Sequence, residues 1–153
     1  MGLQNEKLLD RIGRKILCVL QENARMPLSR IGEKAGLSAP AVAERMRKLE
    51  EAGIITGYHA RIAPEAVGRT VCAFVSLTTD PQNYNAVITL AEQMHQITSC
   101  HHISGEASFI IHVRVEDVPA LESVVERLSP FGRTKTAIVL STPVDKSTMV
   151  PLS

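Results

Sequence analysis

The chain has no tryptophan and few aromatic residues of any kind, three phenylalanines and two tyrosines among 153 residues. Surfaces that stack the bases of single-stranded nucleic acid depend on such rings, so we do not expect that class of binding. No apolar run approaches the roughly 18 residues of a membrane span, and no secretory signal pattern is present. These absences predict a cytoplasmic protein with no membrane partner.

Cysteine is scarce as well. Cys18, Cys72 and Cys100 are isolated and lie in apolar contexts, which is typical of reduced, buried residues. His101 and His102 follow Cys100, but alternate residues of a strand face opposite sides, so packed strand residues are favoured over ligands of one metal ion. The sequence also lacks a phosphate-binding glycine loop, a nucleophile elbow and an HExxH motif. We therefore expect no enzyme activity and no cofactor or metal.

The most informative stretch is residues 28–58, which predicts two short helices joined by a tight turn. Its first apolar residues recur at the spacing of one helix face, at Leu28, Ile31 and Ala35. Gly36 supplies the residue past the helix end, where a left-handed conformation favours glycine. Ser38 is a good N-cap for the second helix, and Pro40 follows within its first turn. This is a helix-turn-helix pattern, whose second helix enters the DNA major groove.

The second helix has a core face and an outward face. Helical spacing turns Val42, Met46 and Leu49 toward the core. A merely solvated outward face would tolerate charged residues equally well, but small residues at its leading end allow close approach to base edges, which favours DNA. The residues that we predict to contact double-stranded DNA are Ser29, Arg30, Ser38, Ala39, Pro40, Ala41, Glu44, Arg45, Arg47 and Lys48.

Charge is distributed unevenly along the chain. Residues 1–63 carry eleven Lys and Arg against seven Asp and Glu, whereas residues 64–153 carry six against nine. A basic N-terminal third suits phosphate neutralisation, which supplies much of the affinity for DNA. Taken alone the difference is small, so it supports the helix-turn-helix interpretation without establishing it.

The periodicity changes after residue 70 to that of a mixed α+β domain. Glu116 and Asp117 read as the cap of its second helix rather than as a catalytic pair. The predicted elements are a strand at 71–78, a helix at 84–94, strands at 99–104 and 107–115 joined at Gly105, a helix at 119–128 and a strand at 133–142. This βαββαβ order is the ferredoxin-like arrangement.

Both helices of such a domain cover one sheet face, and the other face is also partly apolar, with Phe74, Ile110 and Val139 as candidates. The simplest partner for that face is a second copy, so patterning predicts a dimer. A helix at about 6–21 begins the chain. The predicted domains are residues 1–53 (helix-turn-helix), 54–70 (a connecting strand or linker) and 71–153 (ligand binding and oligomerisation).

This combination resembles the Lrp/AsnC family of bacterial and archaeal transcription regulators, and in detail the Lrp-like regulators of Bacillus-type bacteria. The segments that carry the resemblance are LDRIGRKIL, GLSAPAVAERMRKLEEAGIITGY and CHHISGEASF. It implies an α+β chain with a winged-helix-like N-terminal domain, sheet-to-sheet dimers and rings such as octamers, that is, tetramers of dimers.

The resemblance also implies an amino-acid effector bound near the turn between the second and third strands. The family pattern has an aromatic residue at position 107 and an acid at 108, where this chain has alanine and serine. The corresponding residues here are His102, Ser104, Gly105, Glu106, Ala107 and Ser108.

The sequence thus predicts an oligomeric, sequence-preferring DNA-binding transcription regulator. An alternative is a ferredoxin-like small-molecule-binding protein or enzyme with a helical extension. Removal of residues 1–60 separates the two, because it abolishes duplex DNA binding only if the first interpretation is right.

Overall fold

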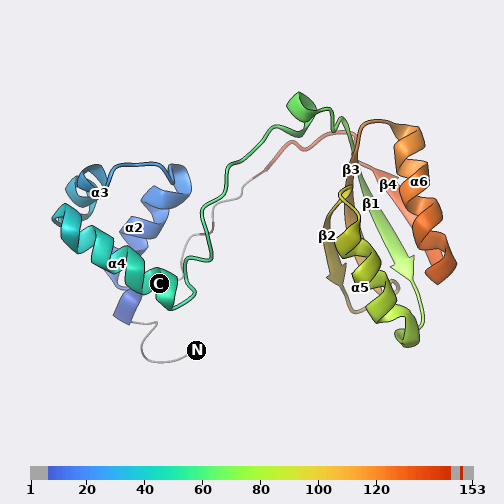
Figure 1. Cartoon of the computed structure of the whole chain (residues 1–153), viewed down its shortest axis with the longest axis horizontal. Helices are drawn as coiled ribbons and strands as arrows, with labels where there is room; N and C mark the ends of the chain where they lie inside the picture. The colour runs from blue at the N-terminus through green and yellow to red at the C-terminus, as the bar shows by residue number, and fades with distance from the viewer. Residues whose placement is uncertain (1–6, 146–148, 150–153) are drawn as a thin grey trace. The chain divides into compact units, whose positions relative to one another are not determined.

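The computed structural model describes residues 7–145 and Met149, which fall into two compact units. One unit contains the described residues up to Ala60 together with Asp145 and Met149, and the other is Arg61–Val144 (Figure 1). Met149 joins the first unit because the side-chain amide of Gln21 exchanges two hydrogen bonds with its backbone, at 2.9 and 2.6 Å. The beginning of the predicted first helix, at Glu6, lies outside the described residues.

The first unit is built from three helices around a small core. The helices are α2 (Arg11–Glu22), α3 (Leu28–Ala35) and α4 (Ala39–Glu51). Apolar stripes from all three meet at the centre of the unit, which is the arrangement that the three-and-four spacing of the sequence predicts. The buried residues are Ile16, Leu17, Val19, Leu20, Ile31, Val42 and Leu49.

The predicted continuous helix at 6–21 is wrong, because the chain breaks at Asp10. Lys7 and Leu8 are helical, but Asp10 is extended and its carboxylate accepts a hydrogen bond of 2.8 Å from the backbone N–H of Gly13. A short polar side chain that caps a free N–H starts a new helix at that point. A side chain at position 13 would lie 1.9 Å from the carbonyl oxygen of Leu8, so glycine permits the close turn.

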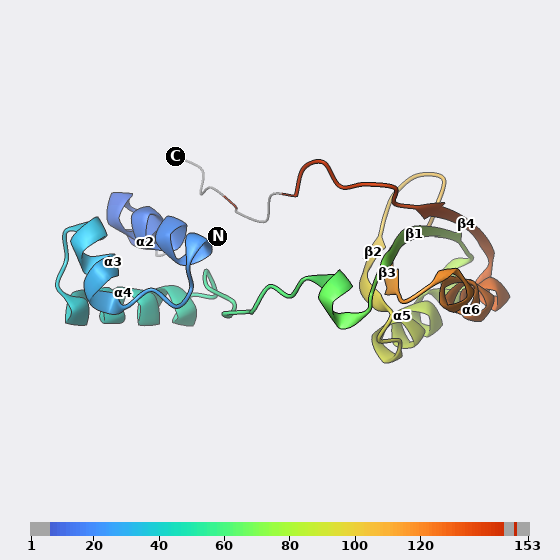
Figure 2. The same ribbon diagram turned by 90° about the horizontal axis from the view of Figure 1, so that it is seen from above.

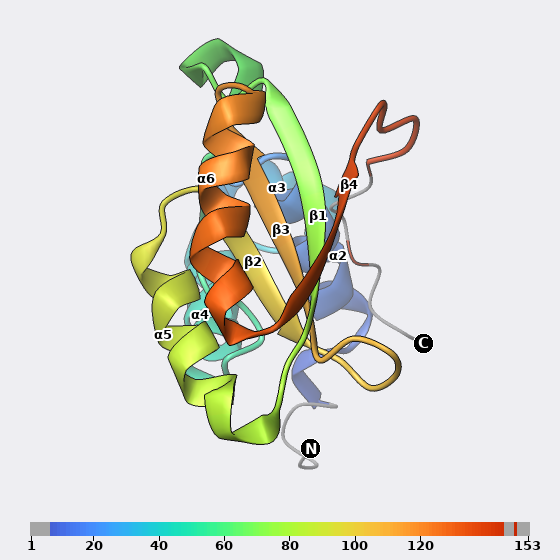
Figure 3. The same cartoon turned by 90° about the vertical axis from the view of Figure 1, so that its right-hand side faces the viewer.

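The second unit has one antiparallel four-stranded sheet. Its elements are β1 (Val71–Thr78), α5 (Tyr84–Gln93), β2 (Ile97–His102), β3 (Phe109–Val115), α6 (Val118–Leu128) and β4 (Arg133–Ile138). The strand order is β2-β3-β1-β4, with β1 and β3 in the centre. Figures 2 and 3 show α5 and α6 together on one side of this sheet. The predicted ferredoxin-like fold is thus confirmed.

Alternation along the central strands divides the residues between the two faces of the sheet. Ala73, Val75 and Leu77 of β1 point under the helices and are fully buried, as are the matching residues of β3. The predicted cap of the second helix is confirmed, since the carboxylate of Asp117 accepts a hydrogen bond from the N–H of Ala120 at 2.8 Å. Neither α5 nor α6 covers the opposite face of the sheet.

Three strand boundaries differ from the prediction. β2 runs over 97–102 rather than 99–104, because a bulge between Ile97 and Ser99 shifts its pairing with β3. β3 begins at Phe109 rather than 107, and β4 ends at Ile138 rather than at 142, where its register with Ala73 of β1 ends. Residues 56–63 of the predicted connecting strand form no strand.

Candidate nucleic-acid interface and ligand loop

The turn between α3 and α4 is tight and depends on two glycines. Gly36 adopts the left-handed conformation, with φ 71° and ψ 38°, as predicted. The N–H of Leu37 donates to the carbonyl of Gly32 at 3.0 Å. A Cβ atom at position 32 would lie 2.4 Å from the carbonyl oxygen of Leu37, so only glycine allows the chain to pass so close to α3. This contact fixes how α4 leaves the turn.

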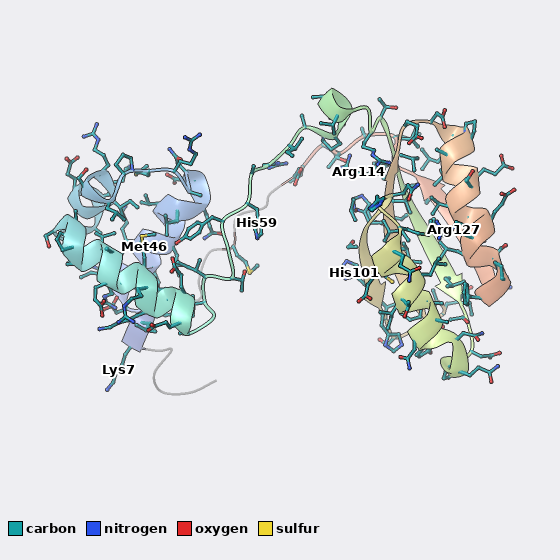
Figure 4. The ribbon with its side chains drawn as sticks, in the orientation of Figure 1. Lys7, Met46, His59, His101, Arg114 and Arg127 are labelled. Atoms are coloured by element: carbon teal, nitrogen blue, oxygen red, sulfur yellow. The ribbon has the colours of Figure 1, made fainter. Side chains whose placement is uncertain are left out.

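The first turn of α4 is capped and lined with small residues. The Ser38 hydroxyl accepts a long hydrogen bond of 3.4 Å from the N–H of Ala41, which confirms the predicted N-cap. Pro40 lies in the first turn and is exposed. Met46 packs against the core of the unit, as labelled in Figure 4, together with the buried Val42. The leading end of α4 therefore presents small side chains to solvent.

The charged residues farther along α4 form a network among themselves. The guanidinium of Arg47 donates to both carboxylate oxygens of Glu44, at 2.9 and 2.8 Å, and also to Glu51. Lys48 lies 3.3 Å from Glu44. The hydrogen bond from Arg47 is the main cause that lowers the pKa of Glu44 to about 2. These pairs are three or four residues apart in the sequence, a spacing that is typical of ion pairs on one helix face. Our prediction assigned Arg47 and Lys48 to DNA without considering these carboxylate partners.

Two further predicted residues have partners that the sequence did not reveal. Arg45 forms an ion pair with Asp10, 35 residues earlier, at 2.5 Å. Arg30 on α3 pairs with Glu33 at 2.8 Å on the exposed surface, and Ser29 beside it is exposed. Arg45 is thus a contact between α4 and the cap of α2 rather than a free cation. A shallow hollow beside α4 is lined by Leu8, Leu37, Ala41, Glu44, Arg45 and Lys48.

Five of the six predicted ligand residues lie in the β2–β3 connection, which is held by residues at the end of β1. The Ser108 hydroxyl donates to the carbonyl of Thr79 at 2.9 Å and accepts from the N–H of the same residue at 3.1 Å. The Ser108 N–H also donates to the carbonyl of Leu77 at 2.9 Å. Gly105, at the tip, has a φ of 127°, a conformation that favours glycine.

A cation that sequence reasoning missed borders this loop. Lys135 of β4 lies 2.9 Å from the carboxylate of Glu106, and this contact is the main cause that lowers the pKa of Glu106. Both side chains are well exposed. Lys135 approaches the loop because β4 is the neighbour of β1, an adjacency that becomes clear only once the sheet order is known.

Three rings lie at the base of the loop. His102, at the end of β2, is 4.7 Å from the ring of Tyr84 and 5.1 Å from that of Phe109. Tyr84 and Phe109 meet edge to face at 5.2 Å. The structure thus brings together His102, Gly105, Glu106 and Ser108 in one loop with an aromatic base. Ser104 and Ala107 belong to the same connection.

Comparison with known proteins identifies both units. The model of the winged helix-turn-helix DNA-binding family matches residues 9–56, and that of the Lrp/AsnC ligand-binding domain matches residues 72–149. The chain belongs to the Lrp/AsnC family. It is a DNA-binding transcriptional regulator, as the sequence predicts, and its second unit matches a ligand-binding domain.

Individual relatives cover nearly the whole chain. The HTH-type transcriptional regulator LrpA of Mycobacterium tuberculosis is 39% identical, over 88% of this chain and 91% of the relative. The structure of Bacillus subtilis LrpC aligns with a TM-score of 0.85 at 29% identity, over 90% of this chain and 99% of that one. The feast or famine regulatory protein of M. tuberculosis, in complex with L-methionine, aligns with a TM-score of 0.86 at 37% identity, over 94% of this chain and 99% of that one.

The described part of the chain, residues 7–145 and Met149, also bears on metal binding and membrane insertion. No three His, Cys, Asp or Glu side chains in this part of the chain lie close enough together to hold a metal ion. No helix there is long and apolar enough to cross a membrane.

Proposed function

We propose that α4 of this Lrp/AsnC regulator enters the major groove of duplex DNA in the cytoplasm and that its first turn reads the bases. The observation that carries this proposal is the capped first turn of α4, where Ser38 and Pro40 are exposed and the small Ala39 and Ala41 are half-exposed. A helix backbone can then approach base edges closely, as recognition helices do in this motif. The residues nearest the bases are Ser38, Ala39, Pro40 and Ala41.

The charged residues have separate roles in this proposal. Lys48 meets a phosphate, Arg47 joins it when Glu44 releases it, and Arg30 and Ser29 on α3 contact the backbone beside the groove. Glu44 either reads a cytosine amino group or keeps the cations from binding every sequence equally. Arg45 contributes indirectly, because its ion pair with Asp10 anchors α4 to the start of α2.

Assembly extends this interface. The helix-free face of the sheet exposes Phe74, whose accessible fraction is 43%, and includes Ile110. A second copy that packs on this face would form a dimer, and four dimers would form an octamer. Two helix-turn-helix units in a dimer would reach major grooves about 34–36 Å apart. Such an oligomer could bend DNA through several simultaneous contacts.

The effector site of this proposal is the 103–108 loop, and the ligand is an amino acid, as in the L-methionine complex of the relative. Backbone N–H groups around Gly105 would receive the carboxylate. The ammonium group needs an acceptor, and the Ser108 hydroxyl is already bonded to Thr79. Glu106 is the available acid, but the ligand must displace Lys135 from it. We therefore expect weak binding.

The DNA proposal is tested with a duplex selected from a random pool by the full-length protein. Lys48→Ala should weaken binding to this duplex and to unrelated duplexes by the same factor and make the salt dependence shallower by about one unit. Lys15→Ala, which removes an exposed lysine of α2, is the matched control. Ala41→Phe should damage specific binding more than nonspecific binding. If neither variant differed from wild type, α4 would not be the reading helix.

The effector proposal is tested by thermal shift with the common amino acids. A ligand that stabilises wild type should stabilise Glu106→Ala less, with Glu65→Ala as a control on the same unit. Tight binding that survives Glu106→Ala would place the ammonium acceptor elsewhere.

A further inference from the structure

The four strands of the sheet contain basic residues but no aspartate or glutamate. Alternation along each strand, together with the register between strands, shows which side chains share the helix-free face with Phe74. The basic residues of this face are His101 of β2, His112 and Arg114 of β3, and Arg133 and Lys135 of β4. Lys135 has its partner, Glu106, in the 103–108 loop. The strand residues of this face therefore offer positive charge and no carboxylate that could balance it.

His112 lies at the centre of this face. β3 and β1 are the two central strands of the sheet, and His112 is the register partner of Phe74 across them. The two rings stack, with their centroids 4.8 Å apart and an angle of 19° between their planes. On its other side Phe74 is the register partner of Ala137 of β4. A second copy that packs on this face would therefore bury the stacked pair of rings.

The charges that act on the ring of His112 are positive. Its Nε2 lies 3.0 Å from the thiol sulfur of Cys72 on β1, and its Nδ1 lies 2.8 Å from the hydroxyl oxygen of Thr98 on β2. The titratable and charged groups that face the ring are Cys72, His101 from β2 and Arg114 from β3 itself, and Figure 4 labels the last two. Partial burial, followed by the positive charges of Arg114 and His101, lowers the pKa of His112.

A second copy on this face would meet the same set of residues. In a two-fold interface both sides present one patch, so the strands of the partner would bring more basic residues and no carboxylate. Arg114 and Arg133 lie near the ends of β3 and β4, where long side chains can keep their charged heads in water. A protonated imidazole at the centre of the interface cannot reach water in this way. Burying its charge without a counter-ion is strongly unfavourable.

We propose that the dimer forms only when His112 is neutral and that protonation of this ring separates the two copies. The inference rests on the sheet-to-sheet dimer of the proposed function and adds a control by acidity to it. The proton does not need to enter a closed dimer, because the free copies take it up and the equilibrium between copies follows by mass action.

The direction of the pH effect follows from the burial of His112. Its pKa is lower in the dimer than in the free copy, because the dimer removes more water from the ring. The free copies therefore bind more protons once the pH falls below the pKa of His112 in the free copy, which is itself below the ordinary 6.5. Dimer stability is fully present above that pKa and is lost as the pH falls through it. With one proton per copy, the logarithm of the dissociation constant rises by up to about two per pH unit.

The consequence for the regulator is a loss of paired DNA contacts in acid. A dimer holds two helix-turn-helix units on one duplex, and each bound unit raises the effective concentration of the other at its own half-site. Separation of the two copies removes this advantage without any change in α4.

The experiment is sedimentation velocity of the fluorescently labelled full-length protein, from nanomolar to micromolar concentration, at a series of pH values between about 7.5 and about 5.0. Circular dichroism at each pH confirms that the helices and strands remain formed. We expect the dissociation constant of the wild-type dimer to rise at least about tenfold across this range, with most of the rise below the ordinary pKa of histidine.

Substitutions at position 112 assign the effect to this ring. His112→Phe keeps a ring beside Phe74 that cannot take up a proton, so its dimer should persist at the acid end of the range. His112→Gln covers the case in which phenylalanine disturbs the packing, and its dissociation constant should be equal at both ends. His95→Asn removes an exposed histidine just before β2 and is the matched control, which should keep the full pH dependence. His101→Asn should keep most of it, because His101 is exposed on an edge strand.

The outcomes separate this inference from the dimer itself. A wild-type chain that is monomeric at micromolar concentration and neutral pH, or a dimer that survives Ile110→Arg, would refute the proposed dimer and the inference with it. A neutral-pH dimer whose dissociation constant is the same in acid would refute the inference alone. So would a pH dependence that persists unchanged in both His112→Phe and His112→Gln.

Discussion

Glu44 controls two cations of α4, so its neutralisation is a direct test of the charge network. Arg47 uses two nitrogens on the Glu44 carboxylate, and Lys48 lies 3.3 Å from it. With a pKa lowered to about 2, mainly by the hydrogen bond from Arg47, this carboxylate is ionised under all conditions in which DNA binding is measured. Glu44→Gln removes the charge that holds Arg47 through two hydrogen bonds, so Arg47 can join Lys48 at the phosphates.

The size of the effect follows from the number of cations released. Each additional phosphate contact steepens the dependence of log K on log salt by about 0.9 for duplex DNA. Glu44→Gln should therefore steepen this slope by up to about 0.9, through the one added contact of Arg47, and by less if Arg47 remains with Glu51. Over the tenfold range from 1 M down to about 0.1 M salt, a slope of about 0.9 corresponds to a factor of roughly eight in affinity. Each added phosphate contact should therefore tighten nonspecific binding at 0.1 M salt by roughly eightfold.

The assay is fluorescence anisotropy with a random-sequence duplex across a series of salt concentrations. Glu50→Gln is the matched control, because it removes the same charge from the same helix while Glu50 accepts its hydrogen bond from the hydroxyl of Tyr58, at 2.7 Å. If Glu44→Gln and Glu50→Gln gave the same slope, Glu44 would not be what keeps Arg47 from phosphate. A loss of specific affinity with a gain of nonspecific affinity would identify Glu44 as a base-reading residue.

Three further variants test the fold and the assembly. Gly32→Ala, whose Cβ would lie 2.4 Å from the Leu37 carbonyl oxygen, should destabilise the first unit by about 1–3 kcal/mol in a denaturant titration. The pKa of Asp10 is lowered, mainly by the N–H of Gly13, so its contribution to stability is present above the ordinary value of 3.8 and is lost as the pH falls below it. Asp10→Ala should lower the free energy of unfolding by about 0.5–2 kcal/mol at neutral pH. It should also make that free energy depend less on pH in the acid range, and an unchanged pH dependence there would contradict this. Ile110→Arg should give monomers or insoluble protein by light scattering, whereas an intact dimer would mean that the helix-free face is not the interface.

Sequence reasoning succeeded where the signal was local. The turn at Gly36 and the caps at Ser38 and Asp117 follow from conformational and hydrogen-bonding preferences of single residues, and the structure confirms all three. Strand 71–78 has the predicted bounds because Asp80 and Pro81 end it. The order of elements in the second unit followed from changes of periodicity in the same way.

The misses concern partners far apart in the sequence. Nothing local indicates that Arg45 pairs with Asp10, or that Lys135 borders the loop at Glu106, since both depend on how elements pack. The end of β4 depends likewise on where its register with β1 runs out. The break at Asp10 is different, because it has a local signal: an aspartate can cap a new helix by accepting from the N–H three residues later, here that of Gly13. The apolar stripe that runs through residues 8–20 suggested one continuous helix instead.

The paired hydrogen bonds between Ser108 and Thr79 determine how the ligand loop responds to acidity. The serine hydroxyl gives one hydrogen bond and takes another, as a residue in an adjacent strand would, and so it extends the β1–β3 pairing with a side chain. Neither group titrates, so this link between the loop and the end of β1 should keep its shape across the physiological pH range. An aspartate at this position could accept from the Thr79 N–H, but once ionised it would repel the Thr79 carbonyl. This regulator therefore has a ligand loop that is tied to β1 by neutral groups, with its one carboxylate, Glu106, exposed.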